Sequence, residues 1–191
     1  MSLGSQIRTT RNERGLTLAE VAEATGLTAS LLSQVERDIT SPSVSTLKKI
    51  GDALGVPVGH FFSDDDSPEA RGAEPIVVPK RSLVVHEHKR KILSPNEGVT
   101  FYLLNPDMSG PIEFIYNVFE PGASTGDDLY THPGVECGLI LEGELEVQMG
   151  HEIYLLRKGD SITFSSEKPH RKRNPGKVQS ISVWANTPPW F

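Results

Sequence analysis

Two histidines and a glutamate in the second half of the chain have the residue types and spacing of a metal-binding set. His132 and Glu136 lie four residues apart, and His170 comes from a separate strand region. Two imidazoles and one carboxylate that converge suit iron(II), zinc, manganese or nickel. The alternative is a metal-free pocket in which the three side chains bond to one another or to an organic ligand. A divalent metal (Zn, Fe, Mn or Ni) is therefore a candidate cofactor, and both interpretations stay open.

Two neighbouring residues are candidates for binding a ligand. Tyr130 can serve as a fourth, weaker metal ligand or donate a hydrogen bond to a bound molecule. Lys172 shares strand parity with His170, so the two side chains should face the same side, where Lys172 would meet a ligand carboxylate. Arg171 and Arg173 should point outward. The competing interpretation is a basic run that points wholly to solvent, which is the commoner placement of charged side chains.

The sequence pattern of the segments that must position these residues predicts an antiparallel roll. Beyond Ile76 the chain consists of short runs of alternating apolar and polar residues, bounded by Gly, Pro and Asn. Tight turns at Glu142-Gly143 and Gly150-His151 should join neighbouring strands as hairpins. The prediction is an all-β C-terminal domain, built as a double-sheet jelly roll.

This part of the chain resembles the cupins, whose fold is a double-stranded antiparallel β-helix. The residues that match the two cupin motifs are His132, Glu136, Gly143, Gly159, His170 and Asn174. Tyr130 stands where the first motif has its first histidine, and Ser165 and Glu167 replace a proline and a glycine of the second. The resemblance implies that His132, Glu136 and His170 are the metal ligands.

The first 62 residues have the periodicity of helices with clear boundaries. Thr17 and Glu20 form a T-x-x-E capping box, which predicts a helix that begins near Leu18. Gly26 should end this helix, and Thr28 can cap the next one. The prediction is an all-α N-terminal bundle, which could bind DNA or serve only for oligomerisation.

The segment from Leu18 to Arg37 resembles the Cro/CI-type (XRE) helix-turn-helix domains, because small or apolar residues occupy the expected positions. The resemblance implies a recognition helix over residues 29–36 that enters the major groove. Gln34 and Ser30 would read base edges, and Ala29 would touch a thymine methyl. Hydroxyls and a guanidinium would contact phosphates. The full set of implied DNA-binding residues is Thr17, Thr28, Ala29, Ser30, Ser33, Gln34, Arg37, Thr40 and Ser43.

Arg11 and Glu36 receive a different role from the same resemblance, in which residues at their positions form an internal ion pair.

The helical half carries no net charge. Through Phe62, six basic residues balance six acidic ones, and the whole chain has a formal net charge of -6. Because non-specific DNA affinity rests on neutralised phosphates, a single copy should bind weakly. A homodimer is therefore the expected DNA-binding form.

Composition divides the chain into a helix-turn-helix domain (1–62), a linker (63–75) and a cupin domain (76–191). The acidic, proline-containing linker cannot bury apolar area. No apolar run is long enough to span a bilayer, and the start lacks the apolar core of a secretory signal, which predicts the cytoplasm. The single cysteine, Cys137, is expected to be buried and inert.

Taken together, the two halves resemble cupin-bearing XRE regulators typified by the putrescine-utilisation repressor, and the tail from Trp184 to Phe191 is similar to theirs. The resemblance implies a DNA-binding transcriptional regulator, a repressor, with a ligand-sensing cupin domain, an operator as partner and a small molecule as effector. The alternative is an iron-dependent cupin enzyme of the hydroxypropylphosphonate epoxidase type, since the triad would suffice for it. A third interpretation is a metal-dependent binding protein without regulatory output.

Overall fold

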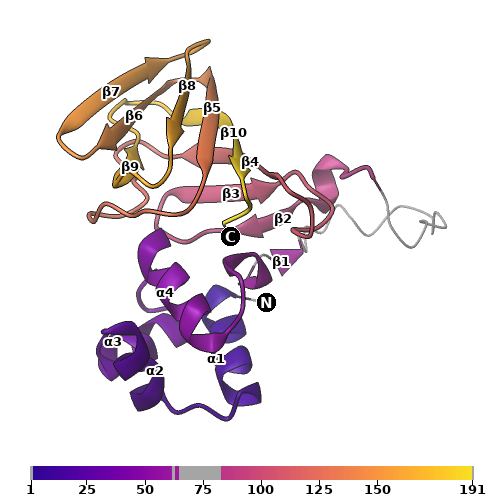
Figure 1. Cartoon of the computed structure of the whole chain (residues 1–191), viewed down its shortest axis with the longest axis vertical. Helices are drawn as coiled ribbons and strands as arrows, with labels where there is room; N and C mark the ends of the chain where they lie inside the picture. The colour runs from indigo at the N-terminus through magenta and orange to yellow at the C-terminus, as the bar shows by residue number, and fades with distance from the viewer. Residues whose placement is uncertain (1, 62, 65–82, 191) are drawn as a thin grey trace.

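The computed structural model describes residues 2–61, 63–64 and 83–190, arranged as a helical part beneath a roll of two sheets (Figure 1). Ser63 and Asp64, predicted to begin the linker, form the short strand β1. The remainder of that predicted linker, residues 65–75, lies outside the described residues. No helix among the described residues is long and apolar enough to cross a membrane.

Serine and threonine side chains set the starts of all four α-helices of the N-terminal part. The hydroxyls of Ser2, Thr17, Thr28 and Ser43 each accept a backbone N–H of the first helical turn. The predicted capping box of Thr17 and Glu20 is confirmed. The helices are α1 (Leu3–Glu13), α2 (Leu18–Thr25), α3 (Ala29–Glu36) and α4 (Val44–Leu54), followed by the 3-10 turn η1 (Val58–Phe61).

A partly buried ion pair joins α1 to α3 in the helical domain. Arg11 Nε and Nη2 donate to the two carboxylate oxygens of Glu36 at 2.6 and 2.9 Å. Arg11 Nη1 also donates to the Leu16 carbonyl at 2.7 Å. The prediction of an internal bridge is confirmed, and the pair fixes the third helix against the first.

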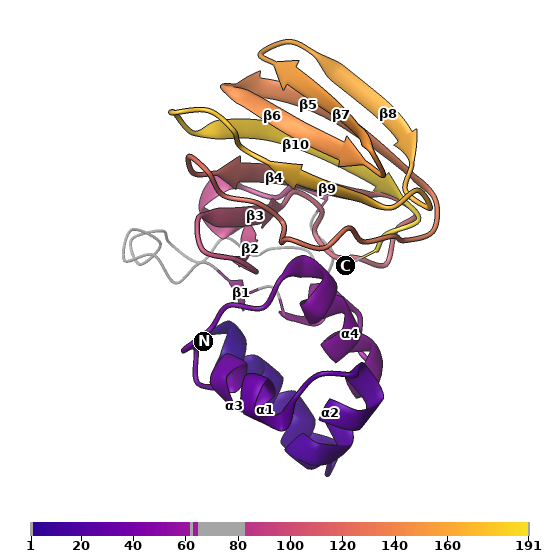
Figure 2. The ribbon, with the colours of Figure 1, turned by 90° about the vertical axis from the view of Figure 1, so that its left-hand side faces the viewer.

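In the part of the chain that the structure describes, ten strands form two antiparallel sheets that face each other (Figure 2). The larger sheet has the order β1-β2-β3-β4-β10-β5-β8, and the smaller has the order β7-β6-β9. After β1, η3 (Glu87–Lys89) precedes the remaining strands, which are β2 (Lys91–Leu93), β3 (Val99–Leu103), β4 (Glu113–Phe119), β5 (Val135–Glu142), β6 (Glu144–Met149), β7 (Glu152–Arg157), β8 (Ser161–Ser165), β9 (His170–Arg173) and β10 (Ser180–Thr187). The predicted all-α bundle followed by an antiparallel roll is confirmed.

Alternation along the strands divides side chains between the interior of the roll and its outer faces. In β10, Trp184 points inward and is almost fully buried, while its neighbours Val183 and Ala185 lie half-buried on the outer side. In β5 the buried residues alternate with exposed ones, and Cys137 is among the exposed. The expectation of a buried Cys137 is therefore wrong, because its register places it on the outer face.

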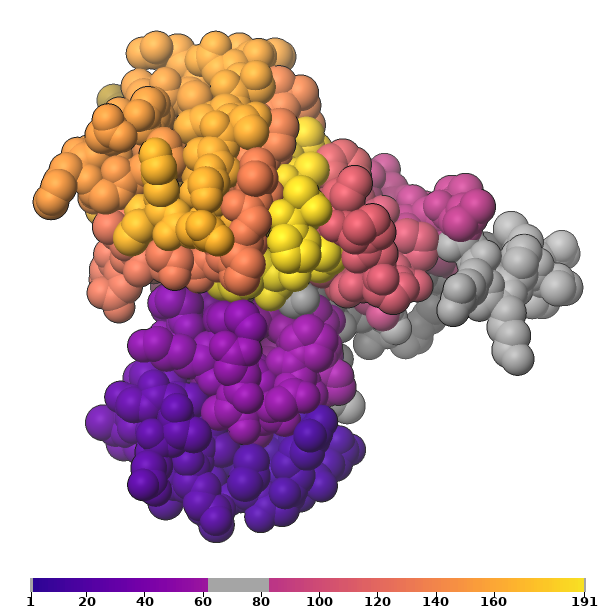
Figure 3. Space-filling model, viewed as in Figure 1, coloured from indigo at the N-terminus to yellow at the C-terminus, as the bar shows by residue number. Residues whose placement is uncertain are grey.

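The helical domain meets the roll at the start of α4 (Figure 3). The Val44 backbone N–H donates to the carbonyl oxygen of Thr125 at 3.2 Å, and Thr125 belongs to the segment between β4 and β5. A methyl group built on Gly126 would lie 2.8 Å from Ser43 Cβ, which shows how closely the two backbones approach. This contact joins the two parts through main-chain atoms.

We expect Glu36→Ala to destabilise the helical domain by about 1–3 kcal/mol, because it leaves the partly buried Arg11 guanidinium without its counter-charge and its hydrogen-bond acceptor. The double variant Arg11→Met with Glu36→Leu removes both charges and should lose less than the single variant. Urea unfolding followed by circular dichroism measures both free energies. Equal losses in the two proteins would contradict a dominant charge effect.

Candidate functional site

The predicted metal-ligand set converges inside the roll. Glu136 lies on β5 of the large sheet, His170 begins β9 of the small sheet, and His132 lies in the segment that precedes β5. All three side chains are buried, and one candidate ligand atom from each lies within 4.8 Å of the others. Backbone bonds of 2.9 Å in both directions between Tyr130 and His170 hold the two segments together.

The Glu136 carboxylate is the centre of the cluster. Its Oε1 lies 2.6 Å from His132 Nε2 and 3.0 Å from His170 Nε2, and its Oε2 accepts a bond from Lys172 Nζ. Burial by itself raises the pKa of Glu136, but the charge of Lys172 and the bonds from both histidines outweigh it and hold this pKa well below its usual value. The carboxyl group is therefore ionised in the folded protein.

The arrangement of His170 fits a metal ligand. Its Nδ1 lies 2.8 Å from the Lys168 carbonyl oxygen, which can only accept, so the Nδ1 proton is fixed there. His170 Nε2 then faces the Glu136 oxygen at 3.0 Å, and this pair of atoms can share a proton or, with a wider separation, a metal ion. Second partners of this kind commonly orient metal-binding histidines. The donor set can hold a divalent metal.

His132 is held differently. Among the described residues, its buried Nδ1 has no hydrogen-bond partner. Its ring instead stacks on Trp190, with centroids 4.4 Å apart and planes at 17°. Aromatic packing, and not a second hydrogen bond, thus fixes this ring.

Lys172 points into the roll, as its parity with His170 predicted. The side chain is 5% exposed, and the ammonium lies 3.7 Å from the ring centroid of Trp184 as well as on Glu136. The competing interpretation of a wholly outward basic run is therefore wrong. Arg171 does turn outward, where it binds the Gln148 side chain and the Asp127 carbonyl.

Tyr130 is a neutral phenol in this site. Burial, followed by the nearby charge of Glu136, raises its pKa well above the usual value. Its ring stacks on Trp190 with centroids 5.2 Å apart and planes at 2°. A neutral phenol is a better hydrogen-bond donor than metal ligand. Of the two predicted roles of Tyr130, this favours hydrogen bonding to a bound molecule over metal ligation.

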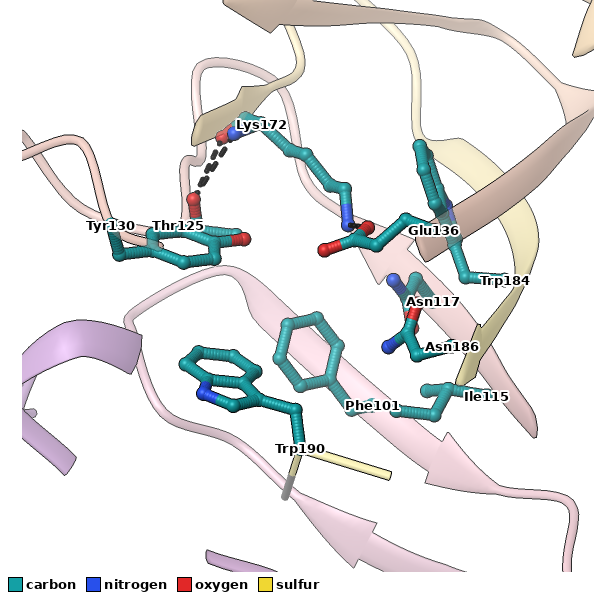
Figure 4. Close-up of a pocket in the computed structure, with 10 residues that line it drawn as sticks. All are labelled: Phe101, Ile115, Asn117, Thr125, Tyr130, Glu136, Lys172, Trp184, Asn186 and Trp190. Carbon is teal, nitrogen blue, oxygen red and sulfur yellow. Dashed lines mark hydrogen bonds and ion pairs between the residues drawn. The ribbon is translucent and has the colours of Figure 1, made fainter. Parts of the chain in front are cut away.

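Next to the cluster lies a small pocket that is partly open to solvent (Figure 4). Its walls combine aromatic rings with two amides, an ion pair and a hydroxyl. The lining residues are Phe101, Ile115, Asn117, Thr125, Tyr130, Glu136, Lys172, Trp184, Asn186 and Trp190.

Most of these walls were not predicted from the sequence. Asn117 and Asn186 are inward polar residues on strands that pair with each other, and their parity with apolar neighbours was the available signal. Trp190 belongs to the C-terminal tail, where its backbone N–H donates to Glu113 Oε2 at 3.0 Å. The alternation of apolar and polar residues in strands does not predict that the C-terminal tail folds back over the pocket.

Seven of the nine predicted DNA-binding residues lie between Thr28 and Thr40, on α3 or next to it, while Thr17 caps α2 and Ser43 caps α4. Thr28, Ala29, Ser30 and Arg37 are exposed, while Ser33, Gln34 and Thr40 are half-buried. Gln34 Oε1 accepts a bond of 3.4 Å from the Thr40 hydroxyl, which limits its rotation.

Thr17 and Ser43 are less free than the other predicted phosphate contacts. The Thr17 hydroxyl donates to the Glu20 carboxylate at 2.7 Å, so a negative charge already lies beside it. Ser43 caps α4 and packs against Gly126 of the roll. Contact of either residue with DNA stays a prediction.

The two halves match known families at the residues that form the bundle and the roll. Residues 7–61 match the family described as helix-turn-helix, and residues 116–185 match the cupin domain. Fold and site thus define a helix-turn-helix protein of the XRE type with a C-terminal cupin domain.

Similar proteins of the same length identify the family. The chain is 30% identical to the HTH-type transcriptional regulator PuuR of Escherichia coli (strain K12), covering 98% of this chain and 96% of that protein. It is 25% identical to the HTH-type transcriptional regulator SutR of the same organism, over 92% and 88% of the two chains. The fold is also similar to that of an HTH_3 family transcriptional regulator from Vibrio cholerae, with a TM-score of 0.62, 21% identity and coverage of 98% and 95%. The protein belongs to the family of HTH-type transcriptional regulators that carry a cupin domain.

If the Trp190 ring closes the pocket, its removal should expose the pocket floor. Trp190→Ala leaves Trp184 as the single tryptophan of the chain. We expect acrylamide to quench Trp184 fluorescence more strongly in this variant than in Trp190→Phe, which keeps an aromatic ring in the wall. Equal quenching in the two variants would show that the tail does not cover the floor.

Proposed function

We propose that this protein is a sequence-specific transcriptional repressor whose operator affinity is set by a small molecule, a divalent metal or both in the cupin pocket. One observation carries the proposal. Thr125 lines the pocket, and its carbonyl oxygen accepts the Val44 N–H at the start of α4. A change in the pocket therefore has a short path to the helical domain. The proposed place of action is the cytoplasm, where the operator would lie.

Two hydrogen bonds between Thr125 and Lys172 continue this path to the charged cluster. The Thr125 N–H donates to the Lys172 carbonyl at 2.9 Å, and the Lys172 N–H donates to the Thr125 hydroxyl at 3.1 Å. The Lys172 ammonium in turn binds Glu136. Occupation of the pocket that moves Lys172 would strain the bonds to Thr125 and so bias the position of α4. Coupling between two sites requires such a differential contact.

We favour regulation over an iron-dependent oxidoreductase. PuuR and SutR, each similar to more than nine-tenths of this chain, are named transcriptional regulators. The helical domain also keeps accessible polar residues on α3, namely exposed Ser30 and half-buried Ser33 and Gln34, which a DNA reader needs.

A gel shift with DNA from upstream of the protein's own gene tests operator binding. Gln34→Ala should cost about 1–3 kcal/mol at one base position in each half-site and relax the preference there. Lys49→Ala, on an exposed position of α4, is the matched control and should keep the base preference. If Gln34→Ala weakens binding equally on all sequences, Gln34 positions the duplex and does not read it.

Operator binding is further proposed to need a homodimer, because the helical domain carries no net positive charge. The roll offers a face for it. The outward side chains of four adjacent strands are mostly apolar, among them Tyr102, Phe114, Tyr116, Val118, Val135, Cys137, Leu139, Ile181, Val183 and Ala185. Its charged groups are Glu142, which lies exposed opposite Ile181 at one end, and Arg90, which lies over Tyr116. Such a face can meet its own copy with little like-charge repulsion.

The size and direction of this face suit a two-fold assembly. At strand spacings of about 4.8 Å and residue rises of about 3.3 Å, it measures roughly 20 Å by 20 Å, which suffices for the core of an interface of about 800 Å² per partner. It lies on the side opposite the small sheet, while the helical domain lies at one end of the roll (Figures 1 and 2). A two-fold axis parallel to the long axis of the molecule would put both helical domains at the same end of the dimer.

We expect the protein to sediment as a dimer and Val183→Glu to sediment as a folded monomer. Val183 pairs with Tyr116 on one side and Leu139 on the other, so the added charge falls in the middle of the face. Thiol titration adds a second readout, since exposed Cys137 should react faster in the monomer. Ile153→Glu, a change on an exposed residue of β7, should remain dimeric. A wild-type monomer on operator DNA would refute the dimer.

A further inference from the structure

The Glu136 carboxylate already binds a cation that belongs to this chain. Lys172 Nζ donates to Oε2, and Nε2 of both His132 and His170 contacts Oε1. The Lys172 ammonium is also held over the Trp184 indole, an arrangement that favours a cation. The only carboxylate of the predicted metal set is therefore shared with a lysine.

A divalent metal on His132, His170 and Glu136 would have to share this carboxylate with Lys172. Two cations beside one buried carboxylate repel each other strongly, because the interior screens charge poorly. If the metal takes the carboxylate for itself, the ammonium stays in the pocket without an anion. An unpaired buried charge is costly.

The neighbouring groups do not supply a replacement anion. Asn117, Asn186 and Tyr130 line the pocket and are neutral. Glu113, the other buried carboxylate on the inner side of the roll, accepts bonds from the Asn186 amide and the Trp190 backbone. The missing negative charge would have to come from a bound molecule.

We propose that Lys172 opposes the binding of a divalent metal alone, so that the pocket takes up a metal together with a small organic acid. The metal would be held by His132, Glu136 and His170, and a carboxylate of the acid would pair with the ammonium released from Glu136. Lys172 thus couples the two binding events. The inference deepens the proposed function by naming the chemical class of the effector, although the binding itself does not involve DNA.

Two further atoms narrow the chemistry of this acid. Among the described residues, the side-chain oxygens of Asn117 and Asn186 are buried and lack a hydrogen-bond partner. Both residues line the pocket, in which four of the eight other lining residues are aromatic (Figure 4). Since an amide oxygen can only accept, a ligand that satisfies it must donate. A small carboxylate that also carries a hydroxyl or amino group meets both requirements.

Calorimetric titration of the chelator-treated full chain with Ni²⁺ tests the coupling, with and without acetate as a carboxylate probe. Wild type should bind Ni²⁺ weakly alone and at least tenfold more tightly in acetate. Lys172→Met should bind Ni²⁺ at least tenfold more tightly than wild type without acetate, and acetate should change its affinity less than twofold. Lys172→Arg keeps the cation and should behave as wild type, and Glu136→Gln should bind weakly in both buffers.

Two results would overturn the proposal. The first is a wild type that binds Ni²⁺ alone as tightly as Lys172→Met. The second is an equal effect of acetate on both proteins, which would assign the effect to the metal in solution. Circular dichroism checks folding, and Lys172→Gln provides the same comparison if the methionine variant is unfolded. A failed gel shift would refute the regulatory function while leaving these affinities as measured.

Discussion

A buried carboxylate must be surrounded by positive charge or hydrogen-bond donors, and Glu136 imposes this requirement on the whole roll. An isolated ionised carboxylate in an apolar interior is so costly that it does not persist. Glu136 lies on the large sheet, and two of its three partners, His170 and Lys172, come from β9 of the small sheet. The pairing therefore selects the register of β9 and ties the two sheets together across the interior.

Local chemistry explains which parts of this architecture were readable from the sequence. Helix starts depend on a side chain and an N–H three residues away, so the caps at Thr17 and Thr28 could be predicted from residue order. The triad could be predicted because His132 and Glu136 are neighbours and His170 falls at a recognisable spacing. Register within one strand also placed Lys172 on the side of His170.

Contacts that depend on the tertiary fold could not be predicted from the sequence. Cys137 was expected inside, yet the strand period that turns Glu136 inward turns Cys137 outward. Asn117, Asn186 and Trp190 meet in one pocket only because β4 pairs with β10 and the tail folds back to Glu113. Nothing in the order of residues specifies these pairings without the sheet topology.

The contact between the two domains is made by the main chain, and this has a consequence for the history of such proteins. The Val44 N–H, the Thr125 carbonyl and the Lys172 carbonyl are present whatever side chains surround them. Substitutions at pocket walls such as Asn117, Trp184 or Asn186 change the shape and polarity of the pocket and leave these peptide groups in place. Under the proposed function, recognition of a new molecule can therefore evolve by point mutation in the roll, while the connection to the helical domain is inherited unchanged.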